Sequence, residues 1–196
     1  MAIIRSIRTS LRAKLVTAFI AVGGAAVVTI GVASYRGARE ALIERTGEFL
    51  QTQSEDAIDK IDRNLMERYG DAQAFAHNPL ALGAPAEVNG LADFLVGAYG
   101  VYDLMLIVDL EGRVVGHNRV TWDGRSVDGG ALRALSLGGE PFFQAIRSGL
   151  ISKTSTFVGE PGRQPFVEDQ EGPGTVSLVY AAPILDEGGR LARIWG

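Results

Sequence analysis

The chain has 196 residues, 46% of them apolar and 21% charged, and it contains no cysteine. This composition allows one ordinary hydrophobic core, and it excludes a disulfide framework and a thiolate metal site. The net charge of -4 is uneven, because Arg5, Arg8, Arg12 and Lys14 precede every acidic residue, so we expect no nucleic acid partner for the acidic remainder.

An uncharged apolar run follows this basic tail. Residues 15–33 contain no charged side chain, and at the helical rise of about 1.5 Å per residue they cover roughly 28 Å. We therefore predict a cytoplasmic tail over residues 1–14 and a transmembrane helix over 15–34, with the following residues outside the cytoplasm. The alternative is a cleaved secretory signal, although the run exceeds the usual apolar core of about 7–15 residues in such signals.

Residues 35–78 have the pattern of a long extracytoplasmic helix. Apolar residues such as Leu50, Ala57, Ile61 and Leu65 recur at intervals of mostly three or four, and Asn78-Pro79 ends the pattern. About forty helical residues extend about 60 Å, too far for one small domain to cover. We predict that part of the apolar stripe contacts a second copy in a homodimer, whereas a core helix lying across a sheet is the alternative for other parts.

The remaining residues are typical of a small domain with strands and short helices. Residues 81–90 resemble a connection, and a short helix follows from Leu91. Two segments each predict a strand, a turn and a second strand, namely 102–118 around the turn 109–112, and 176–195 around the turn 186–189.

Between these two hairpins we predict a short helix over 141–149 and a strand over 153–158, because Pro141 and Gly149 favour the two ends of a helix. The glycine-rich segments 128–130, 138–139 and 171–174 are expected to be loops. The predicted fold class is therefore α+β: a single transmembrane helix continuing into a helical stalk, then an antiparallel sheet with helices on one face.

Several segments, in this order, are similar to the Cache-type sensor domain of bacterial chemoreceptors and sensor kinases, an extracytoplasmic relative of the PAS fold. They are the anchor that runs into a long helix, the strand and turn LIVDLEGRVV, the segment PFFQAIRSG, and the closing hairpin VYAAPILDEGGRLARIWG. The similarity covers residues 35–196. It implies a PAS-like sensor domain over 79–196, truncated at its carboxyl end, on the outer side of the bacterial inner membrane.

The resemblance also implies a small-molecule site between the sheet and the short helices that face it. Aromatic side chains would wall such a pocket, and polar side chains would fix a carboxylate or an amide. The candidate contacts are His117, Trp122, Arg125, Phe142, Phe143, Arg147 and Tyr180. Adjacent helical residues cannot face one way, so at least one of Phe142 and Phe143 is expected in the core. Amino-acid-binding members usually carry an arginine and a tryptophan-tyrosine pair where this chain has Pro-Phe-Phe, which argues against an amino acid ligand.

No catalytic, metal or cofactor site is predicted. The sequence has no G-x-S-x-G elbow, phosphate-binding loop or dinucleotide fingerprint, and His77 and His117 are its only histidines. Asp186 has the turn position at which aspartate bonds to its own backbone, so we exclude it from the site. We expect a receptor that binds a small molecule outside the membrane and transmits a conformational shift inward. The alternative is a membrane-anchored interaction or scaffold protein, which predicts a filled core without a pocket.

Overall fold

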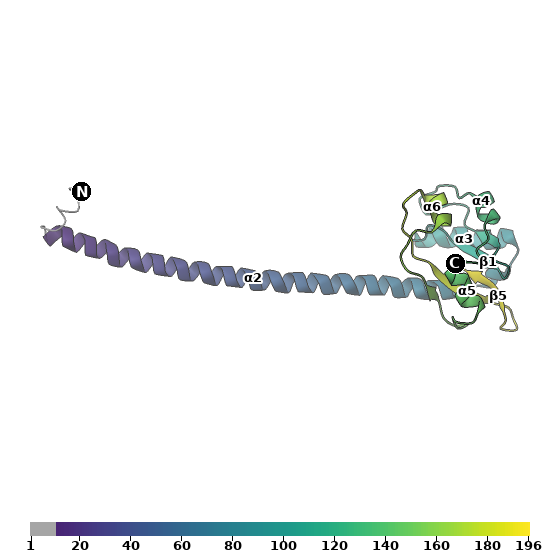
Figure 1. The fold of residues 1–196 in the computed structure, drawn as a ribbon, viewed down its shortest axis with the longest axis horizontal. Coiled ribbons are helices and arrows are strands. Elements are labelled where there is room, and N and C mark those ends of the chain that lie inside the picture. The colour runs from purple at the N-terminus through teal and green to yellow at the C-terminus, as the bar shows by residue number, and fades with distance from the viewer. Residues whose placement is uncertain (1–10) are drawn as a thin grey trace. The chain divides into compact units, whose positions relative to one another are not determined.

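A computed structural model describes residues 11–196, so Arg5 and Arg8 of the predicted tail lie outside it. The chain divides into two compact units, Met1–Ile61 and Asp62–Gly196, which are described separately. The first element, α2 (Leu11–Ala76), is one continuous helix (Figure 1). It contains a segment of mean hydropathy 2.3 that is long and apolar enough to cross a membrane.

Within the first unit, the apolar part of α2 satisfies its own hydroxyl groups. Thr17 and Thr29 donate hydrogen bonds to the carbonyl oxygens of Ala13 and Ala25, one turn earlier in each case. A helix that bonds all its polar groups internally fits a hydrocarbon environment, where no water is present to do so. The composition of this segment therefore agrees with the predicted anchor.

The second unit is built on one antiparallel sheet with the strand order β2-β1-β5-β4-β3. The strands are β1 (Leu106–Asp109), β2 (Val114–His117), β3 (Phe157–Val158), β4 (Tyr180–Leu185) and β5 (Leu191–Trp195). The last strand in the sequence is therefore the central one, paired with β1 on one side and β4 on the other. The predicted α+β class with an antiparallel sheet is confirmed.

The two hairpin turns are built alike, as the sequence predicts. Asp109 accepts hydrogen bonds from the main chain and the guanidinium of Arg113, and Asp186 accepts the same bonds from Arg190. An aspartate that bonds to the backbone ahead of it closes a turn without help from the rest of the fold. Both turns therefore determine locally which strands become neighbours.

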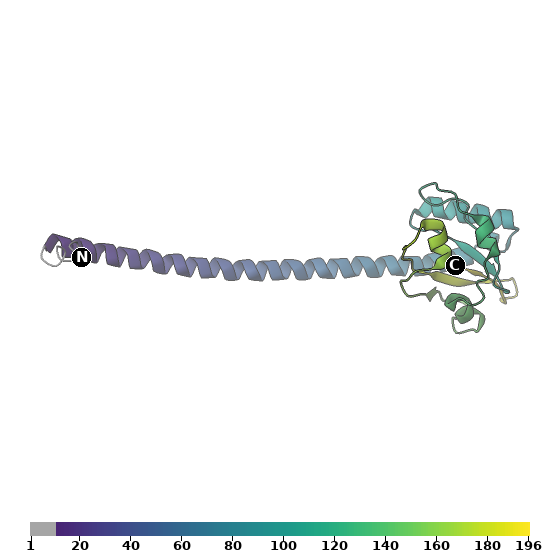
Figure 2. The ribbon, with the colours of Figure 1, turned by 45° about the horizontal axis from the view of Figure 1, so that its top comes forward.

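Helices cover both faces of the sheet, which corrects the prediction of helices on one face. The end of α2 and the helix α3 (Pro85–Tyr99) pack on one face with Ile107, Ile184 and Trp195. The other face packs against α4 (Gly129–Ala134), α5 (Pro141–Arg147) and α6 (Pro165–Glu171). Helices α3 and α5 lie on opposite sides of the sheet (Figure 2). Both faces are buried because the strands carry apolar residues in succession, not in alternation.

Several boundaries differ from those predicted. The structure has a 3-10 turn η1 (Pro79–Leu82) and starts α3 at Pro85, where the sequence predicted a connection. The predicted loop at 128–130 is the start of α4, because Asp128 accepts hydrogen bonds from Gly130 and Ala131 and caps the helix. Helix α6 was not predicted, and the strand predicted over 153–158 is reduced to Phe157–Val158.

Candidate ligand-binding cavity

A cavity of about 300 Å³ lies inside the second unit, beside the end of β5. It is bordered by the end of α2, by residues 101–106 before and at the start of β1, and by residues 176–180 before and at the start of β4. Helices α5 and α6 contribute Phe142, Phe166 and Val167. A cavity of this size holds a small organic molecule.

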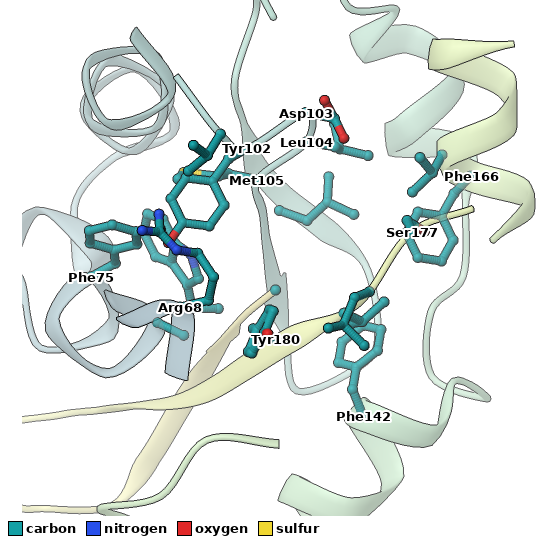
Figure 3. Close-up of a pocket in the computed structure, with 18 of the residues that line it drawn as sticks. Arg68, Phe75, Tyr102, Asp103, Leu104, Met105, Phe142, Phe166, Ser177 and Tyr180 are labelled. Atoms are coloured by element: carbon teal, nitrogen blue, oxygen red, sulfur yellow. The ribbon is translucent and has the colours of Figure 1, made fainter. Parts of the chain in front are cut away.

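The polar side of the cavity is formed by Arg68, Asp71 and Tyr102, of which Arg68 and Tyr102 line it (Figure 3). Nη1 of Arg68 lies 3.1 Å from Oδ2 of Asp71, and both side chains are largely buried, at 15% and 18% exposure. The hydroxyl of Tyr102 donates to the same carboxylate oxygen at 2.6 Å and accepts from Arg68 at 3.2 Å. Burial and the hydrogen bond to Asp71 raise the pKa of Tyr102, so the phenol stays protonated.

Aromatic rings hold the Arg68 guanidinium in place. Its central carbon lies 5.2 Å from the ring centroid of Tyr102 and 6.0 Å from that of Tyr99, within the range of a cation–π interaction. Phe75 packs edge-on against both tyrosines, and its ring centroid is 5.7 Å from that of Trp195. The guanidinium is therefore fixed by an ion pair and by stacking before any ligand is present.

Three buried polar atoms at the cavity have no hydrogen-bond partner among residues 11–196. They are Nε of Arg68, Oγ of Ser177 and the hydroxyl oxygen of Tyr180. Burial raises the pKa of Tyr180, and the nearby Arg68 charge opposes the shift. An unpaired buried polar atom costs about 1–3 kcal/mol, so a ligand that bonds to these atoms recovers free energy that the fold alone does not.

The opposite side of the cavity is apolar. Phe142, Phe166 and Val167 are buried at the face of the sheet that α5 and α6 cover, together with the half-buried Leu104. The figure shows Phe142 and Phe166 on the side away from Arg68 and Phe75 (Figure 3). The cavity therefore combines an apolar wall with a small set of convergent polar groups, as binding sites for small molecules do.

A second charged group adjoins the cavity through Asp103, which lines it. Burial and the negative charge of Glu171 raise the pKa of Asp103, whereas Trp122 and Arg125 lower it. Arg125 forms an ion pair with Glu171, at the end of α6, and another with Asp123 at 2.8 Å. Trp122 and Arg125 thus act on the cavity through Asp103 and do not line it themselves.

Of the seven residues predicted as ligand contacts, the structure places Phe142 and Tyr180 in the cavity wall. Phe143 is a core residue on the same helix, and Arg147 stacks on its ring at 5.8 Å. His117 is buried at the end of β2, where its Nδ1 lies 2.7 Å from the carbonyl oxygen of Asn118. These three residues border no part of this cavity, so their role as ligand contacts remains a prediction.

No protein-family model matches the sequence, and no curated protein does. The ligand-binding domain of the Pseudomonas fluorescens chemoreceptor CtaA, solved in complex with L-isoleucine, is similar over 70% of this chain, with 15% identity and a TM-score of 0.49. The same domain in complex with L-serine is similar over 70% of this chain, with 14% identity and a TM-score of 0.48.

The sensor domain of Escherichia coli DcuS is similar over 66% of this chain and 85% of its own, with 14% identity and a TM-score of 0.43. This chain spans about half of the two CtaA structures, covering 50% and 52% of them. The solved structures that it resembles are thus a chemoreceptor ligand-binding domain, in two complexes, and a sensor domain.

Sequence reasoning missed Arg68, Tyr102 and Ser177 as cavity residues. Arg68 belongs to the long helix, where a charged residue is expected to lie on the face exposed to solvent. One signal was present, because Arg68 follows Leu65 by three positions and precedes Ala72 by four, and these apolar residues belong to the predicted stripe. A charge placed within an apolar stripe is a better candidate for a buried site than one on the opposite face.

Among residues 11–196, no group of three His, Asp or Glu side chains is arranged to hold a metal ion.

Proposed function

We propose that the chain is the ligand-sensing amino-terminal region of a transmembrane signalling receptor of the chemotaxis or sensor-kinase kind, without catalytic activity of its own. The observation that carries this proposal is the position of Arg68. Its side chain lines the cavity, and it lies on α2, the same continuous helix that contains the apolar segment. A ligand that bonds to Arg68 therefore acts on the element that leads to the membrane.

The signal in this proposal is a shift between two positions of the last turns of α2. A ligand that bonds to Arg68 on α2 and to Tyr180 on β4 favours the position in which both groups reach it. A coupling of about 1–3 kcal/mol is sufficient, because the ligand only biases two existing states. Tyr102 and Asp71 hold Arg68 in the present arrangement, so they are the contacts that such a shift changes.

Residues 15–34 form the span of this proposed receptor, in the inner membrane, with residues 1–14 in the cytoplasm and the sensor domain outside. Exposed apolar side chains on α2, including Leu42, Phe49, Leu50 and Ile58, are available for a homodimer contact. Burial of such a stripe against a second copy stabilises a long helix that its own chain leaves uncovered. The proposed partners are therefore the lipid bilayer, a second copy and a small molecule.

The alternative, a membrane-anchored interaction or scaffold protein, predicts a filled core. A polar-lined cavity beside Phe142 favours the sensor instead, because a domain that binds only through its surface gains nothing from buried unpaired polar atoms.

The test is a thermal-shift screen of the full chain in detergent micelles against organic acids, amines, amino acids and nucleobases, because a ligand bound only by the folded state raises the melting temperature. We expect a stabilising compound whose effect Tyr180→Phe removes. Tyr35→Phe is the matched control, since it deletes the same hydroxyl from an exposed residue of the other unit. A well-folded chain that no compound stabilises contradicts the proposal.

A further inference from the structure

Residues 163–176, which contain α6, form a strap whose two ends are joined. The main chains of Gly162 and Ser177, just outside it, exchange two hydrogen bonds, at 3.0 and 2.9 Å. A surface loop of about 6–16 residues whose ends lie close together packs as a compact unit. After α6, Gly172 and Gly174 have positive φ angles of 108° and 89°, which glycine adopts without strain. The strap can therefore move without a change in the sheet.

Few polar contacts hold the strap to the rest of the domain. In the described part of the chain, two side chains of α6 make all the hydrogen bonds and ion pairs that leave it. Glu171 forms its ion pair with Arg125. Oε1 of Gln170 accepts a hydrogen bond from the main-chain N–H of Asp128 at 2.7 Å. Both partners belong to the segment between β2 and α4, so the strap is tied on one side only.

Two apolar side chains keep the strap on the sheet. Phe166 and Val167 are buried in the core on the face that α5 and α6 cover, and both border the cavity. Their burial favours the closed position, and the conformational freedom that the chain gains on opening opposes it. Because these side chains border the cavity, movement of the strap also moves one of its walls.

The ion pair that ties the strap lies among more negative than positive charges. The guanidinium of Arg125 also pairs with Asp123 at 2.8 Å, and its charge acts on Asp103 as well. Only 9% of the Glu171 side chain is exposed, and its Oε1 has no hydrogen-bond partner in the described part of the chain. Burial and the charge of Glu171 raise the pKa of Asp103. Three carboxylates thus share one guanidinium, and closing the strap brings two of them into repulsion.

Other charged groups on the neighbouring elements are paired among themselves. They are Arg68 with Asp71 on α2, Arg119 with Asp93 of α3, and Arg163 with Glu168 inside the strap, at 3.1, 2.6 and 4.0 Å. These cations are already balanced by their own carboxylates. The repulsion between Asp103 and Glu171 is therefore offset by Arg125 and by no further cation from α2 or α3.

We propose that the strap opens and closes as a unit, and that the ion pair between Arg125 and Glu171 holds it closed. Acidification tightens the strap, because a proton on Asp103 removes its repulsion of Glu171. The closed strap binds this proton more readily than the open strap does. Closure therefore strengthens as the pH falls through the raised pKa of Asp103 towards its usual 3.8. This response goes beyond the proposed sensing function, because it needs no ligand.

The experiment is hydrogen exchange of the full chain in detergent micelles at about pH 7 and about pH 4.5, corrected for intrinsic rates and measured by mass spectrometry. Peptides from the strap should be about threefold to tenfold more protected at the lower pH, since a pKa difference of one corresponds to a tenfold change in an equilibrium. Asp103→Asn should have the higher protection at both pH values. Asp169→Asn is the matched control, because it removes the same charge from an exposed residue of α6, and it should keep the original pH dependence.

Arg125→Gln tests whether the strap moves as a unit. This variant should lower the protection of the strap at both pH values, while peptides from β4 keep theirs. If both segments lose protection together, the strap is no independent unit. If the original chain protects the strap equally at the two pH values, or if Asp103→Asn has no larger effect than Asp169→Asn, acid tightening is overturned.

Chemical unfolding gives a second measurement. Because the Asp103 carboxylate opposes closure, Asp103→Asn should unfold at a higher denaturant concentration than the original chain at about pH 7, and the difference should shrink at about pH 4.5. A lower midpoint at neutral pH contradicts the proposal. None of these measurements contains a ligand, so a failure of the strap leaves the proposed sensing function standing, and the thermal-shift screen tests that function separately.

Discussion

Gly116 of β2 lies against Val88 of α3 with no room for a side chain. A Cβ at position 116 would be 3.0 Å from the Cβ of Val88 and closer still to its Cγ1. Ordinary contacts between carbon atoms are about 3.5–4.0 Å long. Rotation of the Val88 side chain does not relieve the contact with its Cβ, so α3 itself must move in the Gly116→Ala variant. The backbone of Gly116 does not require glycine, because its φ is negative.

Overpacking of this kind costs about 1–3 kcal/mol. In a chain of this size we expect Gly116→Ala to lower the melting temperature by roughly 2–12 °C, measured by circular dichroism in micelles. Val88→Ala alone should cost roughly 2 kcal/mol through the cavity that it leaves. Because the new methyl group then occupies that cavity, the double variant should be more stable than the sum of the single effects indicates.

Gly90→Ala is the control, because Gly90 lies in α3, the same helix as Val88. A Cβ there meets nothing within 4 Å, so this substitution should stabilise the chain by about 0.5–1 kcal/mol. If Gly116→Ala is as stable as the original chain, or if Val88→Ala does not offset it, the packing of α3 on β2 differs from that described.

Two further predictions concern single hydrogen-bonded groups. Thr156→Val removes the buried hydroxyl that donates to the carbonyl oxygen of Tyr69 at 2.8 Å, and should cost about 1 kcal/mol in chemical unfolding, whereas Thr156→Ser should cost less because it keeps the donor. Although partial burial opposes the shift, hydrogen bonds from the main chain and the guanidinium of Arg113 lower the pKa of Asp109 below its usual 3.8. The folded state therefore binds this proton less readily than the unfolded state, so the stabilisation is present above pH 3.8 and is lost as the pH falls through the lower, folded-state pKa. Between those two values, the stability of Asp109→Asn should depend less on pH than that of the original chain, and equal slopes would contradict the assignment.

The hairpins and the long helix were predictable because their signals are local. Asp109 and Asp186 each stand at the start of a turn that ends in glycine, and the structure closes both turns with bonds inside the turn. Asn78-Pro79 was expected to end the long helix, and α2 stops at Ala76. In each case, the residues that cause the feature are neighbours in the sequence.

The start of α4 was mispredicted because its first glycine, Gly129, serves tertiary packing. A Cβ on Gly129 would overlap the imidazole of His117, so glycine is needed there although it weakens a helix. The cavity was only partly predictable for a similar reason. Phe142 and Tyr180 were expected from the family resemblance, whereas Arg68 reaches the cavity from a helix more than a hundred residues before β4. The local pattern places Arg68 within the apolar stripe of its helix, but it does not indicate that β4 lies on the other side of the cavity.

The central position of β5 affects how the domain is made. During synthesis, β1 and β4 leave the ribosome before Leu191–Trp195, the strand that finally separates them. Until then each presents an open edge of apolar sequence, which can pair wrongly with the other or with another nascent chain. The sheet therefore forms by insertion of β5 between β1 and β4. This step makes contacts between residues far apart in sequence, and such folding is slow. We expect the yield of folded protein to depend more on chaperones and on expression temperature than the modest size of the domain suggests.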